Sequence, residues 1–120
     1  MKLAVTSRGK DLESAMDPRF GRAPYFILVD SETMAFVVVN NSQSLNLPQG
    51  AAIQAGQTIV KNKADVQITG NCGPKAFQVL QSAGIEIVTG ASGSVKDAVM
   101  QYKNGKLKST QSPNVEGHWV

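Results

Sequence analysis

One short pattern occurs twice in this chain and limits how it can fold. The pattern Thr-Gly-x-x-Gly is found at residues 69–73 and again at residues 89–93, each time after a short apolar run and before a helix-like segment. Apolar runs that alternate with helical segments are typical of parallel strands joined by crossover helices. The pattern therefore predicts an α/β fold in which both glycine loops lie at the carboxyl edge of the sheet, where such folds bind ligands.

The rest of the chain completes the expected sheet. Strands are expected at 2–7, 25–29, 35–40, 65–69 and 85–88, and helices at 50–62, 74–83 and 94–104. The turn between the second and third strands is too short for a crossover, so it predicts an antiparallel hairpin. The order β-β-β-α-β-α-β-α then predicts a five-stranded mixed sheet with an antiparallel second strand, covered by three helices.

The helix expected at 50–62 has an apolar face that includes a glycine. Residues on this face recur at helical spacing, which predicts that the face is buried: Ala52, Ile53, Gly56, Ile59 and Val60. Gly56 costs about 1 kcal/mol relative to alanine inside a helix. We therefore expect it to allow close packing of the helix on the sheet. In the last helix, Ser94 and Asp97 form a Ser-x-x-Asp start signal.

Length and composition indicate one domain. Residues 1–105 are expected to form the fold, and residues 106–120 a polar tail that is mobile apart from His118 and Trp119. His118 is expected to have no role. The N-terminal apolar run is too short for a signal peptide, and no stretch approaches the roughly 20 apolar residues of a membrane span. A single cysteine cannot form an internal disulfide. These features predict a cytoplasmic protein, which we expect to be a monomer.

Cationic groups gather at the predicted carboxyl edge. The segment DPRFGRAP (17–24) precedes the antiparallel strand and brings Arg19 and Arg22 there, while Lys75 lies in the first turn of the helix after the first glycine loop. Arg22 could instead pair with Asp17. Helix N-termini offer N–H groups and partial positive charge to anions. The net charge of +3 is too small to indicate nucleic acid, so the sequence predicts a site for a compact, multiply charged anion.

Cys72 has two interpretations that the sequence leaves open. A lone cysteine is most often a small buried hydrophobe, whereas a position at a helix N-terminus could lower its thiol pKa and favour the thiolate. Ser92 takes the corresponding place in the second loop, so the two loops share their glycines and helix starts and not the thiol. The backbone near Cys72 is therefore expected to matter more than its sulfur.

Catalytic and common metal-site patterns are absent from the sequence. Neither glycine loop has the Gly-x-x-x-x-Gly-Lys-[Ser/Thr] or Gly-x-Gly-x-x-Gly spacing. One cysteine and one histidine cannot supply the four ligands of a structural zinc site within one chain. The first strand, KLAVTS, carries no carboxylate of the kind that a two-metal nuclease needs. We therefore expect a protein that is not an enzyme.

Four segments carry a family resemblance that covers essentially the whole chain: MKLAVTSRGKDLES…DPRFGRAPYFILVD, GAAIQAGQTIVKNKADVQITGNCGPKAF, GIEIVTGASGSVKDAV and NVEGHWV. They resemble the dinitrogenase iron–molybdenum cofactor biosynthesis family, which includes NifX-like and NifB carboxy-terminal-like domains. The resemblance implies a ribonuclease H-like fold with strand order 3-2-1-4-5 and binding or carrying of metal–sulfur clusters. One small, free-standing type of member, known from sulfate-reducing bacteria, is associated with a mixed molybdenum–copper sulfide cluster held without covalent protein ligands.

The chain departs from this family at one place. Many relatives have a cysteine after the second arginine, where this chain has Ala23. The resemblance therefore implies a pre-assembled anionic cluster, either molybdenum–copper sulfide or a related metal–sulfur cluster, held without covalent bonds and exchanged with partner proteins. The expected binding residues are Arg19, Gly21, Arg22, Asn71, Cys72, Gly73, Pro74, Lys75, Ser92, Gly93 and Ser94. Cys72 is expected as a soft metal contact that binding does not require. The alternative is a phosphate- or nucleotide-binding regulatory module on the same loops.

Overall fold

The computed structural model describes residues 1–41 and 50–113. Most of the polar loop expected at 40–50 and the end of the expected tail lie outside these ranges. The elements in chain order are β1 (Lys2–Ser7), the 3₁₀ turn η1 (Phe20–Arg22), β2 (Tyr25–Asp30), β3 (Phe36–Asn40), α2 (Ala51–Lys61), β4 (Val66–Ile68), α3 (Pro74–Ser82), β5 (Glu86–Val88) and α4 (Val95–Lys103). Every expected strand and helix is present, with bounds shifted by at most two residues.

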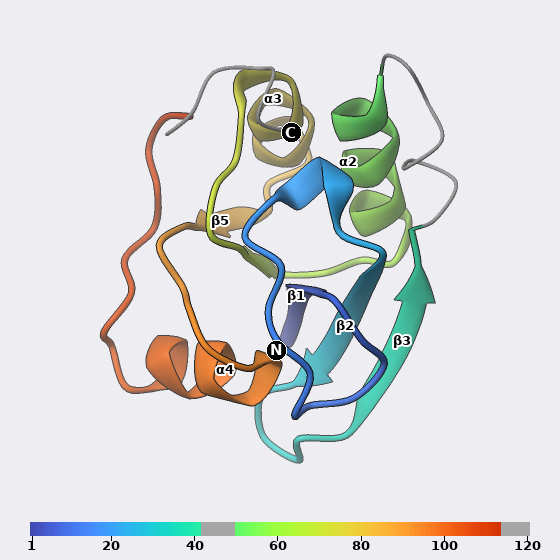
Figure 1. Ribbon diagram of the computed structural model, residues 1–120. Helices are drawn as coiled ribbons and strands as arrows, with labels where there is room; N and C mark the ends of the chain where they lie inside the picture. The colour runs from blue at the N-terminus through green and yellow to red at the C-terminus, as the bar shows by residue number, and fades with distance from the viewer. Residues whose placement is uncertain (42–49, 114–120) are drawn as a thin grey trace.

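The five strands form one mixed sheet in the order β3-β2-β1-β4-β5. β2 is antiparallel to both of its neighbours, and β1, β4 and β5 are parallel to one another. The predicted α/β architecture, strand order and antiparallel second strand are thus confirmed. Helices α2 and α3 cover one face of the sheet and α4 covers the other (Figure 1).

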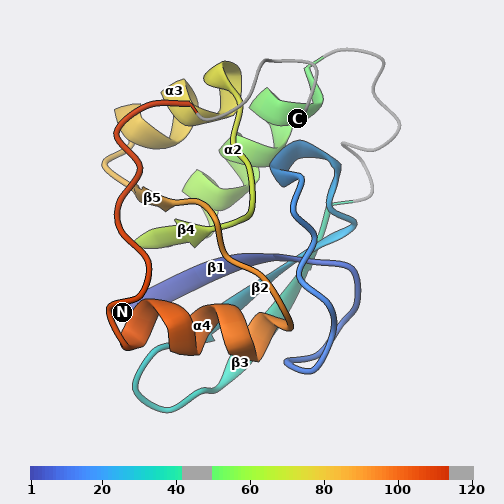
Figure 2. The ribbon, with the colours of Figure 1, turned by 60° about the vertical axis from the view of Figure 1, so that its left-hand side comes forward.

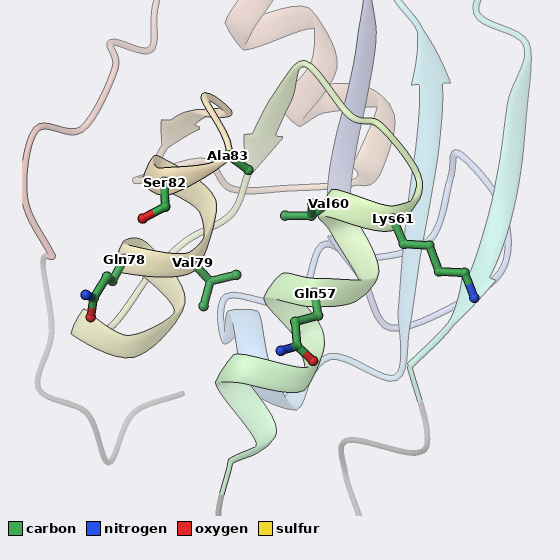
Figure 3. Close-up of a pocket in the computed structure, with 7 residues that line it drawn as sticks. All are labelled: Gln57, Val60, Lys61, Gln78, Val79, Ser82 and Ala83. Carbon is green, nitrogen blue, oxygen red and sulfur yellow. The ribbon is translucent and has the colours of Figure 1, made fainter.

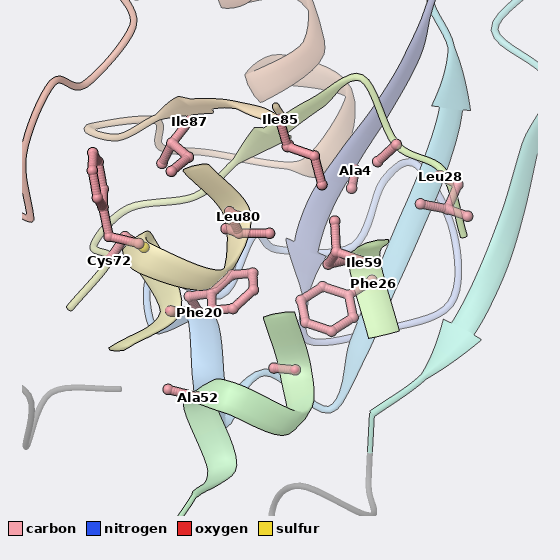
Figure 4. Packing of buried hydrophobic residues seen from close by; sticks show 14 residues of the cluster. Ala4, Phe20, Phe26, Leu28, Ala52, Ile59, Cys72, Leu80, Ile85 and Ile87 are labelled. Carbon is pink, nitrogen blue, oxygen red and sulfur yellow. The ribbon is translucent and has the colours of Figure 1, made fainter. Parts of the chain in front are cut away.

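Alternation along the strands divides the core between these two faces. Ala4 and Phe26 belong to the cluster under α2 and α3, whereas Val5 and Ile27 belong to the cluster under α4. Side chains of successive strand residues point to opposite faces, which is why neighbouring residues join different clusters. Figure 4 shows the first cluster, in which the rings of Phe20 and Phe26 lie 5.4 Å apart between centroids. Phe20 comes from η1, so this packing ties the arginine-bearing segment to the core.

The buried face of α2 differs from the expected one. Ile53 and Val60 are each 37% exposed, so the expectation that both are buried is wrong. The residues that α2 buries are small, mainly alanines, because the helix packs against α3 as well as against the sheet. Gly56 faces α3 and not the sheet: a Cβ added there would lie 2.9 Å from Cγ1 of Val79. Close packing is thus confirmed, but against a different element.

The first part of the tail is attached to the sheet, so the expectation of a mobile tail is wrong for Ser109 and Thr110. Ser109 forms an antiparallel bridge with Val88, and the N–H of Thr110 donates to the carbonyl of Ile87 at 2.6 Å. The Ser109 hydroxyl also donates to Glu86 Oε2 at 2.7 Å. These contacts satisfy backbone groups on the outer edge of β5, which would otherwise need water. The division of the chain at residue 105 stays a prediction.

Candidate functional site

The loops that carry the predicted site meet at one end of the sheet. β1, β4 and β5 end there and β2 begins there, so the loops after and before these strands lie at the right-hand ends of the strands in Figure 2. The N–H of Gly90 donates to the carbonyl of Gly70 at 3.0 Å. The two glycine loops therefore lie side by side, as their pattern predicts.

The arginine-bearing segment packs directly on the first glycine loop. Arg19 forms a parallel bridge with Asn71, whose N–H donates to the carbonyl of Pro18 at 2.7 Å. The approach is so close that a Cβ added to Gly70 would lie 2.8 Å from Cα of Pro18. The structure thus brings the segment containing Arg19, Gly21 and Arg22 against the loop containing Asn71, Cys72 and Gly73.

A buried carboxylate holds Arg19 in place. Asp17 is 1% exposed, and its Oδ1 accepts hydrogen bonds from the backbone N–H of Arg19 at 2.9 Å and from Arg19 Nε at 3.4 Å. Asp17 Oδ2 lies 3.9 Å from Nε of Arg8. The ion pairs of Asp17 are therefore with Arg19 and Arg8, and not with Arg22. Since the Arg19 side chain stays 50% exposed, its guanidinium is oriented by Asp17 while still facing solvent.

Two further cations at this edge were missed by the sequence analysis. Arg8 has a 59% exposed side chain, and Nζ of Lys10 lies 5.5 Å from the centroid of the Tyr25 ring. Tyr25 begins β2 opposite Ser7, so both cations lie at the end of the sheet that carries the glycine loops. Their position immediately after the first strand could have identified them, because the same reasoning from strand ends identified Arg19 and Arg22.

The start of α3 is open to an anion. Gly73 is its N-cap residue and provides no side-chain cap, and Pro74 at the first position has no N–H. Within the described parts of the chain, the N–H groups of Lys75 and Ala76 have no acceptor, but Ala76 is fully buried. Pro74 and Lys75 are exposed. This helix start therefore combines the exposed N–H group of Lys75 with the charge of its side chain.

The start of α4, in contrast, is closed. The N–H groups of Val95 and Lys96 donate to the carbonyls of Ser14 and Leu12, both at 2.9 Å. Ser94 and Asp97 form a complete capping box, with both bonds at 3.0 Å, which confirms the predicted start signal. The expectation that both helix starts offer free donors is thus wrong for α4, because the loop after β1 folds over it.

Residues of the second glycine loop are likewise engaged with the rest of the chain. The carbonyl of Ser92 accepts from Gln101 Nε2 at 3.0 Å, and the carbonyl of Gly93 accepts from the N–H of Met16 at 2.9 Å. Ser92 and Gly93 are exposed and Ser94 is half-buried. These residues shape the side of the site, whereas the N–H groups that have no acceptor among the described residues come from the start of α3.

Cys72 is a buried core residue. Its side chain has no exposed surface and belongs to the cluster under α2 and α3, where Figure 4 shows it. Burial disfavours the charged form and raises the pKa of the thiol to about 12. The interpretation as a small buried hydrophobe is thus confirmed. The suggestion that the helix start lowers this pKa is wrong, because loss of hydration outweighs the helix dipole here.

We expect Cys72 to resist alkylation in the folded protein. A rise of the thiol pKa from 9.0 to about 12 lowers the thiolate fraction at pH 8 about 1,000-fold. Iodoacetamide labelling followed by mass spectrometry should show almost no modification in buffer and full modification in denaturant. Because the folded state favours the neutral thiol, its contribution to the free energy of unfolding is present below pH 9 and is lost as pH rises toward 12. Rapid labelling of the folded chain would contradict the buried position.

The described residues do not supply the ligand set of a metal ion, and a large groove of the protein lies elsewhere. The described residues include no group of three or more His, Cys, Asp and Glu side chains that could hold a metal ion. A groove of about 580 Å³ lies between α2 and α3 and includes none of the predicted binding residues (Figure 3). In the two described ranges, no helix has the length and apolarity to span a membrane.

Comparison with known proteins identifies the family. The orange protein from Desulfovibrio gigas, solved in its apo form, is 43% identical, with a TM-score of 0.92 over 95% of this chain and 96% of that chain. A candidate NifB protein from Thermotoga is 32% identical, with a TM-score of 0.83 over 97% of this chain and 98% of that one. An uncharacterized protein of Methanocaldococcus jannaschii is 25% identical over 97 residues, which are 78% of this chain and 80% of the relative. The family described as dinitrogenase iron-molybdenum cofactor matches residues 1–105, and the chain belongs to this family.

Proposed function

We propose that the chain binds and carries a pre-assembled, anionic metal–sulfide cluster at the loop edge and catalyses no reaction. One observation carries the proposal. The bridge between Arg19 and Asn71 places Arg19, whose side chain is half-exposed, beside the loop that leads into α3, where Lys75 adds a second cation. Cationic side chains and free N–H groups together favour a multiply charged anion over a neutral or cationic ligand.

The residues present fit a cluster held by charge and hydrogen bonds better than one held by thiolates. The sulfides of such a cluster would accept a hydrogen bond from the exposed N–H group of Lys75. Cys72 is buried and protonated, so it would lie beneath the cluster and give at most a soft contact. Ala23, where the family resemblance implies a cysteine in many relatives, is also buried and offers no ligand. Arg19, Arg22 and Lys75 would balance the negative charge.

The cluster that this proposal favours is a mixed molybdenum–copper sulfide. Support comes from the 43% identity to the orange protein, together with the family resemblance, which associates the small, free-standing type of member with that cluster. A related metal–sulfur cluster, such as a precursor of the iron–molybdenum cofactor, has the same negative charge and sulfide surface and would suit the same groups. A carrier of either kind would receive its cargo from one protein and deliver it to another.

Reconstitution tests the proposal. Apo protein is mixed with tetrathiomolybdate and copper under anaerobic conditions and separated from free reagents by gel filtration. We expect charge-transfer absorption, molybdenum and copper to co-elute with the protein. The alternative, a phosphate- or nucleotide-binding module, predicts that nucleotides raise the melting temperature while the thiomolybdate is washed away. That second outcome, or retention of no metal, would refute the proposed function.

A further inference from the structure

The outer edge of β3 is a surface that the proposed cluster site leaves unused. β3 is the last strand on its side of the sheet, and its inner edge pairs with β2. Its sequence, FVVVN, contains no charge, proline or glycine, although natural edge strands usually carry such blocking features. Val37 is 63% exposed and Phe36 is 40% exposed. An apolar edge without blocking residues favours the addition of another strand.

The hydrogen-bond pattern shows which residues face outward. The N–H of Asp30 donates to the carbonyl of Ala35 at 2.9 Å, so these two residues form a hydrogen-bonded pair between β2 and β3. Such pairs alternate along antiparallel strands. Val37 and Val39 therefore direct their backbone groups inward to β2. Val38, between them, directs its N–H and C=O outward, where no strand of the described chain pairs with it.

The two ends of this edge carry opposite charges on the face that α2 covers. Lys61 extends from α2 and lines a groove with Val39 and Asn40, beside the end of β3 (Figure 3). Asp30 lines another groove near Phe36, at the beginning of β3. Lys2, a cation that shares this second groove, is engaged with α2, since its amine donates to the carbonyl of Asn62 at 2.9 Å. The edge thus has a basic end and an acidic end.

We propose that the edge of β3 pairs with β3 of a second copy of this chain, antiparallel and about a twofold axis at Val38. In this register Val38 would exchange both backbone hydrogen bonds with the partner's Val38. Val37 would pack beside the partner's Val39, which covers the most exposed apolar side chain of the strand. Lys61 would face the partner's Asp30 twice, because a twofold axis makes the contact self-complementary. The dimer would reverse the expectation of a monomer.

Site-directed cross-linking tests the register. Cα atoms of a hydrogen-bonded antiparallel pair lie about 5.5 Å apart, within the span of a disulfide. Val38→Cys should therefore form a covalent dimer under mild oxidation. Val37→Cys is the matched control: its side chain is more exposed, but its symmetry mate would lie beyond the roughly 7 Å limit for a disulfide. Cys72 is buried and does not compete. Cross-linking of Val37→Cys as fast as Val38→Cys would overturn the register.

Sedimentation equilibrium tests the dimer itself. The wild-type chain should associate reversibly with increasing concentration. Val38→Pro removes an N–H that β2 does not use, and we expect it to raise the dimer dissociation constant at least about tenfold. Lys61→Glu should also weaken the dimer, whereas Lys96→Glu, on α4, changes the net charge equally and should have no effect. A chain that stays monomeric throughout, or a dimer insensitive to Val38→Pro and Lys61→Glu, would overturn the proposal.

Discussion

Replacing Arg19 and Arg22 together with alanine is expected to weaken binding of a molybdenum–copper sulfide cluster roughly 100-fold, since each lost charge-assisted contact at a half-exposed site contributes about 1.5 kcal/mol. Arg19 keeps half of its side-chain surface exposed beside the first glycine loop. The removal of two cations should also reduce the salt dependence of binding, because fewer charges are left to be screened. Titration of the cluster at two salt concentrations, followed by its charge-transfer absorption, measures both effects.

The matched control for this variant lies on the opposite face of the sheet. Lys103, at the end of α4, and Lys106, just after it, are exposed, so their double substitution by alanine changes the net charge equally while leaving the loop edge intact. We expect wild-type affinity from this control. If both double variants lose affinity to the same extent, the effect comes from overall charge. Wild-type affinity in the arginine variant would exclude this edge as the binding site.

Local sequence signals predicted the elements and the sheet well, for identifiable reasons. The short link between β2 and β3 allows only a hairpin, and a Ser-x-x-Asp signal such as Ser94–Asp97 caps a helix through contacts within one turn. The glycine loops follow strands that are parallel neighbours, so their meeting follows from topology. Each of these conclusions needs only residues close in sequence or the pairing of adjacent strands.

Features that depend on contacts between residues far apart in the chain could not be predicted from the sequence. The two helix starts look equivalent in sequence, yet Leu12 and Ser14, about 80 residues earlier in the chain, accept the N–H groups of α4 and leave only α3 open. Periodicity likewise placed Ile53 and Val60 on a buried face, because it cannot tell how α2 is rotated between the sheet and α3. The burial of Cys72 has the same origin. The sequence therefore predicted that the loops meet at one edge, but not the hydrogen bonds that close the start of α4.

Gly70→Ala is expected to lower the free energy of unfolding by about 2–3 kcal/mol through overpacking. The added Cβ would lie 2.8 Å from both Cα and Cβ of Pro18 and 3.0 Å from its carbonyl oxygen. Two of these atoms belong to the backbone, so no side-chain rotation can relieve the contact. The loops must separate instead, which stretches the 2.7 Å hydrogen bond between Asn71 and Pro18. Urea unfolding followed by circular dichroism measures the loss.

Gly84→Ala is the control for the general cost of replacing a glycine with alanine, because it lacks the contact that Gly70→Ala makes with Pro18. Gly84 has a φ of +77° and open space around it, so its substitution costs only backbone strain, about 1 kcal/mol. We expect cluster affinity to fall in Gly70→Ala and to stay unchanged in Gly84→Ala, because only the former moves Arg19 away from the open start of α3. A Gly70→Ala protein that is no less stable than Gly84→Ala, and that binds as the wild type does, would show that the contact between these two loops does not organise the site.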